Sequence, residues 1–72
     1  MFYILSFRNN FGQKRYFNRF VCDRKDDWYD CDSLESAHHF KSDNEAEKVR
    51  KELNAIVEKN KWYGKYQVEF VA

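Results

Sequence analysis

Proline is absent from this 72-residue sequence, and glycine occurs only at positions 12 and 64. The chain therefore lacks the Pro-rich and Gly-rich stretches that form linkers between domains. We expect a single domain that spans residues 1–72. The two glycines are expected at turns, because glycine tolerates positive φ at no steric cost.

Long apolar runs are also missing. No stretch approaches the ~20 apolar residues needed to cross a bilayer, and the first residues, MFYILSFR, lack the charged lead and long apolar region of a signal peptide. We therefore expect a cytoplasmic protein with no membrane partner. Cysteine is scarce too, and in that compartment Cys22 and Cys31 are expected to be reduced thiols.

Net charge is nearly absent as well, at +1, which argues against a polyanion binder that works by bulk electrostatics. The charges are nevertheless unevenly placed. Residues 8–25 contain six basic residues and one acid, whereas residues 26–35 contain five acids and no base. This pattern predicts either a charge-patterned surface for partner selection or two segments that face and neutralise each other.

Aromatic and other apolar residues are abundant, at 19% and 43% of the composition. This content is too high for a disordered segment, so the chain should fold. At this length a chain buries only about 60% of its unfolded surface. We therefore do not expect a large active-site cleft.

Three β-rich segments separated by turns predict antiparallel hairpins. Residues 2–8 form the first strand, NNFG at 9–12 the first turn, and residues 13–22 the return strand. A second turn at 23–27 leads into a short third strand at 28–31.

The clearest periodic segment is a helix over residues 43–59. Ser42 and Glu45 form a capping box in front of it, and the apolar residues that follow recur with helical spacing. After it, residues 65–72 (KYQVEFVA) alternate between apolar and polar side chains and predict a final strand. The predicted fold class is α+β, a small antiparallel sheet of order β-β-β-α-β with one amphipathic helix packed on one face.

One helix covers only one face of such a sheet, and strict alternation places large apolar groups on both faces. Phe2 and Ile4 share the second face of the first strand. We expect this face to stay partly exposed and to bind a partner protein, because aromatic residues and arginine dominate binding hot spots. The alternative is that strand twist and residues 32–41 cover it. The predicted contact residues are Ile4, Arg15, Phe17, Arg19 and Val21.

The stretch KRYFNRFV, residues 14–21, also supports a nucleic-acid hypothesis. It shares the basic start and the Phe-Val pair with an RNA-recognition motif but lacks both glycines of that motif. Single-stranded bases stack on aromatic rings beside basic residues in such sites. The residues that would make these contacts are Lys14, Arg15, Tyr16, Phe17 and Arg19.

The cysteines and the adjacent histidines do not predict a metal site or a cofactor. A turn tip at residues 26–27 pairs residue 25 with residue 28 and places Cys22 opposite Cys31. Together with His38 and His39 these residues include zinc ligand types, but their spacing differs from that of paired zinc knuckles, and adjacent histidines on a strand point to opposite faces.

Catalytic motifs are missing too: the sequence has no nucleophile elbow, no Gly-rich phosphate loop and no HExxH motif, so we predict no enzymatic activity. Four aromatic residues near predicted turns are interpreted first as core closure at the ends of the sheet and second as partner contacts. They are Trp28, Tyr29, Trp62 and Tyr63.

The segment SAHHFKSDNEAEKV, residues 36–49, resembles the A-x-x-F-x-S/T-x-x-E-A run of small uncharacterised phage and prophage accessory proteins. The resemblance is carried by Ala37, Phe40, Ser42, Glu45 and Ala46. It implies an accessory factor that binds rather than catalyses, such as an anti-CRISPR protein, an anti-restriction protein or a transcriptional modulator. It transfers no functional residue.

The predicted function is therefore a small non-enzymatic module, encoded by a phage or mobile element and acting in the host cytoplasm. It inhibits or modulates a host protein or ribonucleoprotein by occluding its surface. Two alternatives remain open: a single-stranded nucleic-acid binder that uses residues 14–21, and a homodimeric structural module.

Overall fold

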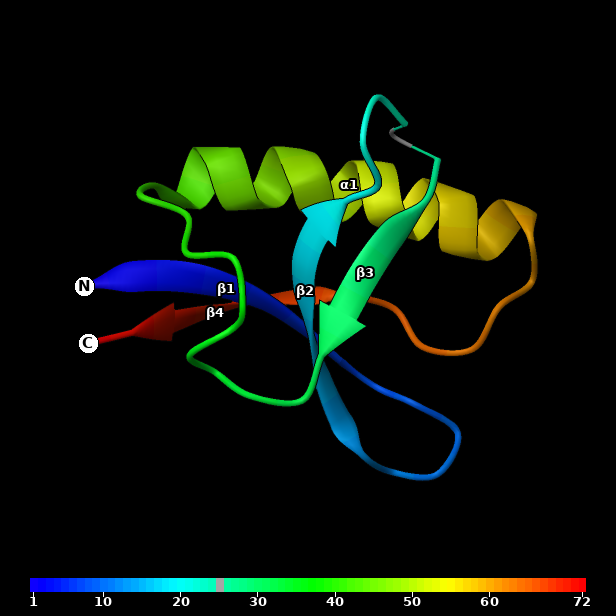
Figure 1. The fold of residues 1–72 in the computed structure, drawn as a ribbon, viewed down its shortest axis with the longest axis horizontal. Coiled ribbons are helices and arrows are strands. Elements are labelled where there is room, and N and C mark those ends of the chain that lie inside the picture. Colours follow the sequence, from blue (N-terminus) through cyan, green and yellow to red (C-terminus); the bar gives the residue numbers. More distant parts are fainter. Residues whose placement is uncertain (25) are drawn as a thin grey trace.

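The computed structural model describes residues 1–24 and 26–72. Its elements are β1 (Phe2–Arg8), β2 (Lys14–Phe20), β3 (Trp28–Cys31), α1 (Asp43–Lys59) and β4 (Gln67–Val71) (Figure 1). The strands form one antiparallel sheet in the order β3-β2-β1-β4. This architecture confirms the predicted α+β class and the predicted order of elements. None of the described residues form a helix with the length and apolar character that crossing a bilayer requires.

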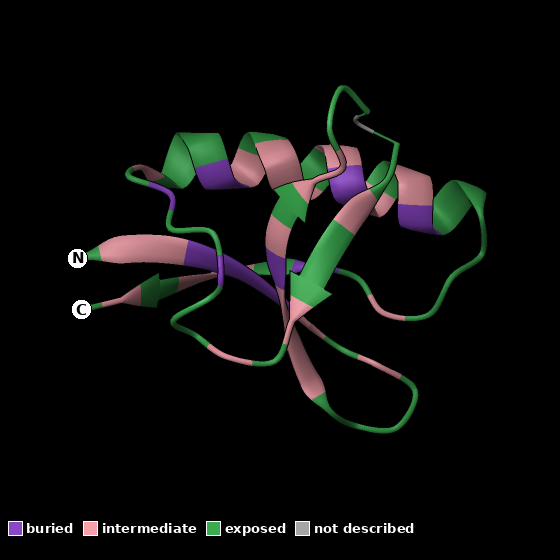
Figure 2. Ribbon diagram, viewed as in Figure 1, coloured by how far each residue is buried: buried purple, intermediate pink, exposed green. Residues whose placement is uncertain are grey.

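Helix α1 has the predicted bounds, and its start is built as the capping box indicates. The Ser42 hydroxyl accepts a hydrogen bond from the backbone N–H of Glu45 at 3.2 Å. One apolar stripe of the helix is buried, at Ala46, Leu53 and Val57. Figure 2 shows these buried turns on the side of the helix that faces the strands.

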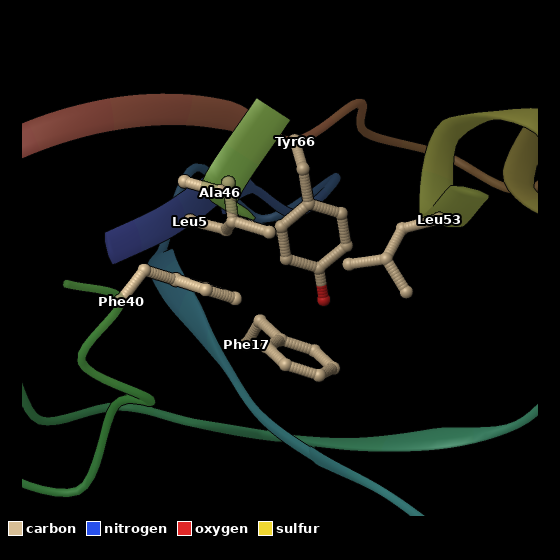
Figure 3. Packing of buried hydrophobic residues seen from close by; sticks show 6 residues of the cluster. All are labelled: Leu5, Phe17, Phe40, Ala46, Leu53 and Tyr66. Atoms are coloured by element: carbon tan, nitrogen blue, oxygen red, sulfur yellow. The ribbon is translucent and has the colours of Figure 1, made fainter. Parts of the chain in front are cut away.

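The main core lies between α1 and one face of the sheet. The register pairs Tyr3 with Phe70 and Leu5 with Val68, so these side chains share the helix side of β1 and β4. Figure 3 shows how side chains from β1, β2, α1 and two loops meet there. The buried cluster consists of Leu5, Phe17, Phe40, Ala46, Leu53 and Tyr66.

Strand β2 does not alternate strictly, because its pairing with β3 is interrupted by a bulge. Phe17 pairs with Asp30 and Phe20 with Trp28, and the register shifts between residues 17 and 19. A bulge places one extra residue in a strand, so side chains three positions apart come to the same face. Phe17 and Phe20 therefore both lie on the helix side, with ring centroids 5.1 Å apart. The predicted grouping of Phe17 with Arg19 on the outer face is wrong. Arg15 pairs with Phe7, so alternation from Arg15 places Phe17 on the helix side, and the bulge after Phe17 brings Phe20 to that side as well.

The segment between β3 and α1 inserts where β1 and β2 diverge. The β1–β2 ladder pairs only residues 6–8 with 14–16. Beyond it, Tyr3 exchanges backbone hydrogen bonds of 2.8 and 2.9 Å with Phe40, and the N–H of His38 donates to the Phe17 carbonyl at 2.9 Å. Figure 1 shows this segment crossing β1.

The same segment covers the second face of the sheet. His39 stacks on Phe2 with ring centroids 3.8 Å apart, and Ala37 is buried outside the helix-side cluster. Ile4, which points away from the helix, is only 1% exposed. The expectation of an exposed second face is therefore wrong at Ile4. The alternative, in which residues 32–41 cover this face, is confirmed at Phe2, on which His39 stacks.

The second hairpin has a different register from the predicted one. Cys31 pairs with Tyr16, and Cys22 lies exposed beyond the end of β2, which stops at Phe20. The predicted pairing of Cys22 with Cys31 is therefore wrong, and both thiols are free. Residue 25, which the prediction paired with residue 28, lies outside the described residues.

Candidate partner-binding surface

The contact surface predicted on β2 is not assembled as expected. Phe17 is only 3% exposed and belongs to the main core, and Ile4 is buried on the opposite side of the sheet. Val21 is half-buried just after β2, and its N–H donates to the Asp27 carbonyl at 3.0 Å. The predicted residues thus lie on two faces and at a turn, and they do not form one patch.

The basic residues of this strand are largely engaged within the molecule. Lys14 pairs with Glu69 at 2.9 Å, and Arg15 pairs with Asp30 at 2.6 Å. The hydrogen bond to Asp30 raises the pKa of Arg15. Arg19 is exposed and lies over the Tyr29 ring, 4.9 Å from its centroid. The neutralisation of basic by acidic segments, one of the two outcomes that the charge pattern predicts, occurs at Arg15 and Asp30.

Phe17 and Arg19 do border a small hollow on the helix side, about 160 Å³ in volume. Its walls come from β2, from α1 and from the segment that inserts between β1 and β2. The lining residues are Phe17, Arg19, Phe20, His38, Phe40 and Val49. Burial lowers the pKa of His38, so this hollow has little charge of its own beyond Arg19.

A chemically richer cavity lies at the other end of the sheet, where the chain returns from α1 to β4. We call it the aromatic pocket. It has a volume of about 160 Å³ and combines aromatic rings with carboxylates. Its lining residues are Phe7, Asp27, Trp28, Asp30, Val57, Trp62, Tyr63, Gly64 and Tyr66.

The end of α1 places Trp62 at this pocket. Lys61 adopts φ of 56°, and its N–H donates to the Glu58 carbonyl at 3.2 Å. The N–H of Trp62 donates to the Val57 carbonyl at 3.0 Å. These two bonds make up a Schellman motif, in which an apolar contact between Trp62 and Val57 is the usual companion. Both side chains line the pocket.

Tyr66 forms the inner wall and is held on both its backbone and its ring. The Asn54 side chain on α1 accepts from the Tyr66 N–H at 2.7 Å and donates to the Tyr66 carbonyl at 3.0 Å. The Trp28 indole N–H donates to the Tyr66 hydroxyl at 3.0 Å, and the Phe7 ring packs 4.7 Å from the Tyr66 ring. Burial raises the pKa of Tyr66, which keeps the phenol protonated.

Gly64 lets the loop approach β1 closely. Its φ is 89°, and a Cβ atom at this position would lie 2.7 Å from the Phe7 ring and 2.8 Å from the Arg8 carbonyl oxygen. Such distances are below any normal contact, so only glycine fits without displacement. The pocket wall next to Phe7 therefore depends on this glycine.

Two carboxylates give the pocket its polarity. Asp30 is paired with Arg15, whereas the Asp27 carboxylate accepts the Trp28 N–H at 2.9 Å. Among the residues that the structure describes, Asp27 forms no ion pair. A neighbouring hollow of about 400 Å³ shares Asp27 and Trp62 and continues toward Lys59.

The aromatic residues at the rim of the pocket, Trp62 and Tyr63, belong to the four that the sequence indicated first as core closure and only second as partner contacts. Trp62 is 53% exposed and Tyr63 is 68% exposed, so core closure does not describe them. Trp28 is half-buried, with its ring edge-on to Trp62 at a centroid distance of 6.0 Å, and does close the sheet. The acids of the pocket were missed, although Asp27 and Asp30 flank Trp28 in the sequence.

The metal-ligating side chains of residues 1–24 and 26–72 do not cluster into a site. Within that part of the chain, no group of three or more His, Cys, Asp and Glu side chains is arranged to hold a metal ion. Burial raises the pKa of Cys31, which makes its thiol a poor nucleophile at neutral pH.

Comparison with protein-family models, with curated proteins and with solved structures found no match to the chain. The function is therefore inferred from the residues of the molecule itself.

Proposed function

We propose that this chain is a small non-enzymatic module that binds a partner protein at the aromatic pocket and occludes the surface it covers. The observation that carries the proposal is the exposure of Trp62 and Tyr63 at the rim of a formed cavity. Tryptophan and tyrosine are enriched among hot-spot residues, and fully desolvated pockets concentrate binding free energy. Exposed rings that stand beside a cavity are suited to such a contact.

The pocket is already formed in the isolated chain. The Schellman motif fixes Trp62, the Asn54 amide fixes Tyr66, and Gly64 sets the loop against Phe7. A preformed site loses less conformational entropy on binding than a flexible loop does. This preformed geometry supports recognition by shape rather than non-specific adhesion.

The charges favour protein over nucleic acid as the partner. Asp27 and Asp30 line the aromatic pocket, and carboxylates repel the phosphates of a nucleic acid. On β2, Lys14 and Arg15 are already paired with acids, so fewer basic groups are free to meet phosphates. Single-strand binding by residues 14–21 stays a prediction with less support than protein binding.

A host protein or ribonucleoprotein is the partner class we propose, with inhibition by occlusion as the outcome. That part of the proposal, including a phage origin and an anti-CRISPR-like role, is supported by the resemblance at residues 36–49. A homodimer is the second candidate, because β4 is an edge strand and Phe70 on it is 54% exposed. Light scattering separates the two, since only the homodimer doubles the mass of the isolated protein.

The experiment that tests the proposal compares two variants in a pull-down from nuclease-treated bacterial lysate. The double variant W62A/Y63A removes the rim, whereas Phe11→Ala removes a still more exposed aromatic residue from the β1–β2 turn. We expect a partner protein to be retained by the wild type and by Phe11→Ala but lost from W62A/Y63A. Equal retention by both variants, or loss on nuclease treatment, would overturn the proposal.

A further inference from the structure

The aromatic pocket combines two features that together select a positively charged ligand. Five of its lining residues carry aromatic rings, Phe7, Trp28, Trp62, Tyr63 and Tyr66. Aromatic faces carry the negative part of the ring quadrupole and attract cations within about 6 Å, tryptophan most strongly. Carboxylates at the same walls add a direct charge attraction.

The formal charge of the pocket sets the charge of its occupant. Arg15 neutralises Asp30 at 2.6 Å, while the Asp27 carboxylate bonds to the backbone N–H of Trp28. Among the described residues, Asp27 is therefore the carboxylate of the cavity wall that has no ion pair. Arg24, which is paired with Asp26, and Lys59 line the neighbouring hollow and not this cavity. A monocation complements the charge of Asp27, whereas a carboxylate or phosphate group is repelled.

The size of the cavity limits the ligand to a single side-chain head. At about 160 Å³ it is close to the volume of a cavity, about 150 Å³, that holds a benzene molecule. A guanidinium group with part of its apolar stem fits this space. Among protein cations the guanidinium is also the one that is weakly hydrated and stacks on aromatic rings, whereas ammonium is strongly hydrated.

We propose that the aromatic pocket binds an arginine side chain presented by the partner protein, with the guanidinium among the rings of Trp28, Trp62 and Tyr63 and paired with Asp27. This inference rests on the proposed function and names the group that the pocket recognises. The arginine stem packs along Val57 and Trp62, and the Tyr66 hydroxyl, kept protonated by burial, leaves the charge balance unchanged.

A peptide titration tests the charge requirement directly. The probes are acetyl-Gly-Arg-Gly-amide, its lysine counterpart and its citrulline counterpart, which keeps the shape of arginine without the charge. Binding is followed by the NMR signals of the two indole N–H groups, of Trp28 and Trp62. We expect the arginine peptide to bind roughly fivefold or more tightly than citrulline, as the loss of a cation–π contact and an ion pair implies. Equal affinity for arginine and citrulline, or tighter binding of lysine, would overturn the inference.

Asp27→Asn is the matched variant, because the asparagine carbonyl still accepts the Trp28 N–H while the charge is removed. It should abolish the preference for arginine over citrulline. Asp32→Asn changes the net charge equally at an exposed residue that does not line the pocket, and it should keep the preference. A preference that persists in Asp27→Asn contradicts the assignment.

The same variants separate this inference from the proposed function. If Asp27→Asn still captures the partner protein while W62A/Y63A does not, the pocket binds the partner by a group other than a cation. If all of these variants capture the partner equally, the proposed function fails as well. Binding of adenosine monophosphate at the two indoles, in preference to the arginine peptide, would instead favour nucleic acid.

Discussion

Two segments of this protein are both rich in aromatic and basic residues, but they differ in how far their aromatic side chains are buried. Residues 14–20 (KRYFNRF) place Phe17 in the core and pair two of their basic residues with carboxylates. Residues 61–66 (KWYGKY) leave Trp62 and Tyr63 exposed beside a cavity. The difference lies in what surrounds each segment. A strand in the middle of a sheet is covered by other elements, whereas a loop at the end of a helix has only one side to pack against.

The comparison also explains where charge is available for binding. The sheet position of β2 brings Glu69 from β4 and Asp30 from β3 within reach of its basic side chains. In the loop after α1, Lys65 and Glu58 form a longer, exposed ion pair at 3.8 Å, and the carboxylates of Asp27 and Asp30 line the cavity beside the loop. Basic character in a sequence is therefore a poor guide to a basic surface in this molecule.

The largest effect that we expect in the comparison is the destabilisation caused by Phe17→Ala. Truncation of a buried phenylalanine costs about 3–5 kcal/mol, because apolar contact is lost and a cavity remains. Phe17 packs against Phe20, Phe40 and Leu5, so relaxation cannot fill the space easily. Urea unfolding should report this loss in the free energy of unfolding.

Phe11→Ala is the control for that measurement, because Phe11 is 82% exposed. Its effect should stay within about 0.5 kcal/mol, as is usual for surface substitutions. A Phe17→Ala protein that is as stable as Phe11→Ala would mean that β2 does present Phe17 to solvent, as the face assignment from the sequence predicted.

A second, smaller effect should distinguish the two glycines. Both have positive φ, but only Gly64 has a neighbour, the Phe7 ring, where its Cβ would be. Gly12→Ala should cost about 1–2 kcal/mol, the left-handed penalty of an L-residue. Gly64→Ala should cost more, because Phe7 or the Arg8 carbonyl must also move, and it should weaken binding at the pocket.

Thermal or urea unfolding of Gly12→Ala and Gly64→Ala measures this difference. Two equal values would show that the loop accommodates a methyl group without moving β1. In that case the aromatic pocket is more adaptable than its close packing indicates.

The smallest expected effect is on the pH dependence of stability. It tests whether Lys14 on β2 is paired with Glu69 on β4. Burial raises the pKa of Glu69, but hydrogen bonds from the Ser6 hydroxyl and from Lys14 outweigh it and lower the pKa below its usual value. A carboxylate with a lowered folded-state pKa stabilises the fold above its unfolded pKa of about 4.3. That stabilisation is lost as the pH falls through the lower pKa that Glu69 has in the folded protein.

Glu69→Gln should therefore flatten the fall in stability between about pH 5 and pH 3. Urea unfolding of both proteins across that range measures the slope. Parallel slopes for the wild type and Glu69→Gln would mean that Lys14 and Ser6 leave the titration of Glu69 unaffected, and that Lys14 is free to meet a partner.

Most of the secondary structure was predictable from the sequence, and the predicted surface was not. The helix bounds at Asp43–Lys59 and the Ser42 cap agree with the structure because capping and apolar period are local properties. The face assignment of Phe17 failed because it depends on the register of β2 against β1, which pairs Arg15 with Phe7. The covering of Phe2 depends on His39, a residue far from it in the chain, whose ring stacks on the Phe2 ring.

The aromatic residues of the candidate site were predicted from the sequence, and its carboxylates were not. Trp62 and Tyr63 were recognised as partner contacts of second rank, but nothing local indicated that Asp27 and Asp30 would line the same cavity. The two carboxylates precede α1 in the sequence, whereas the two aromatic residues follow it. A local pattern records neither their proximity nor the pairing of Asp30 with Arg15.

The sequence by itself determined which segments become strands, helix and turns, because those choices follow from backbone propensity, caps and the period of apolar residues. Only the tertiary structure decided which aromatic rings are buried, which charges neutralise each other and where a cavity forms. Those outcomes depend on contacts between residues far apart in the chain. Phe17 became core and Trp62 became surface because of their neighbours in space.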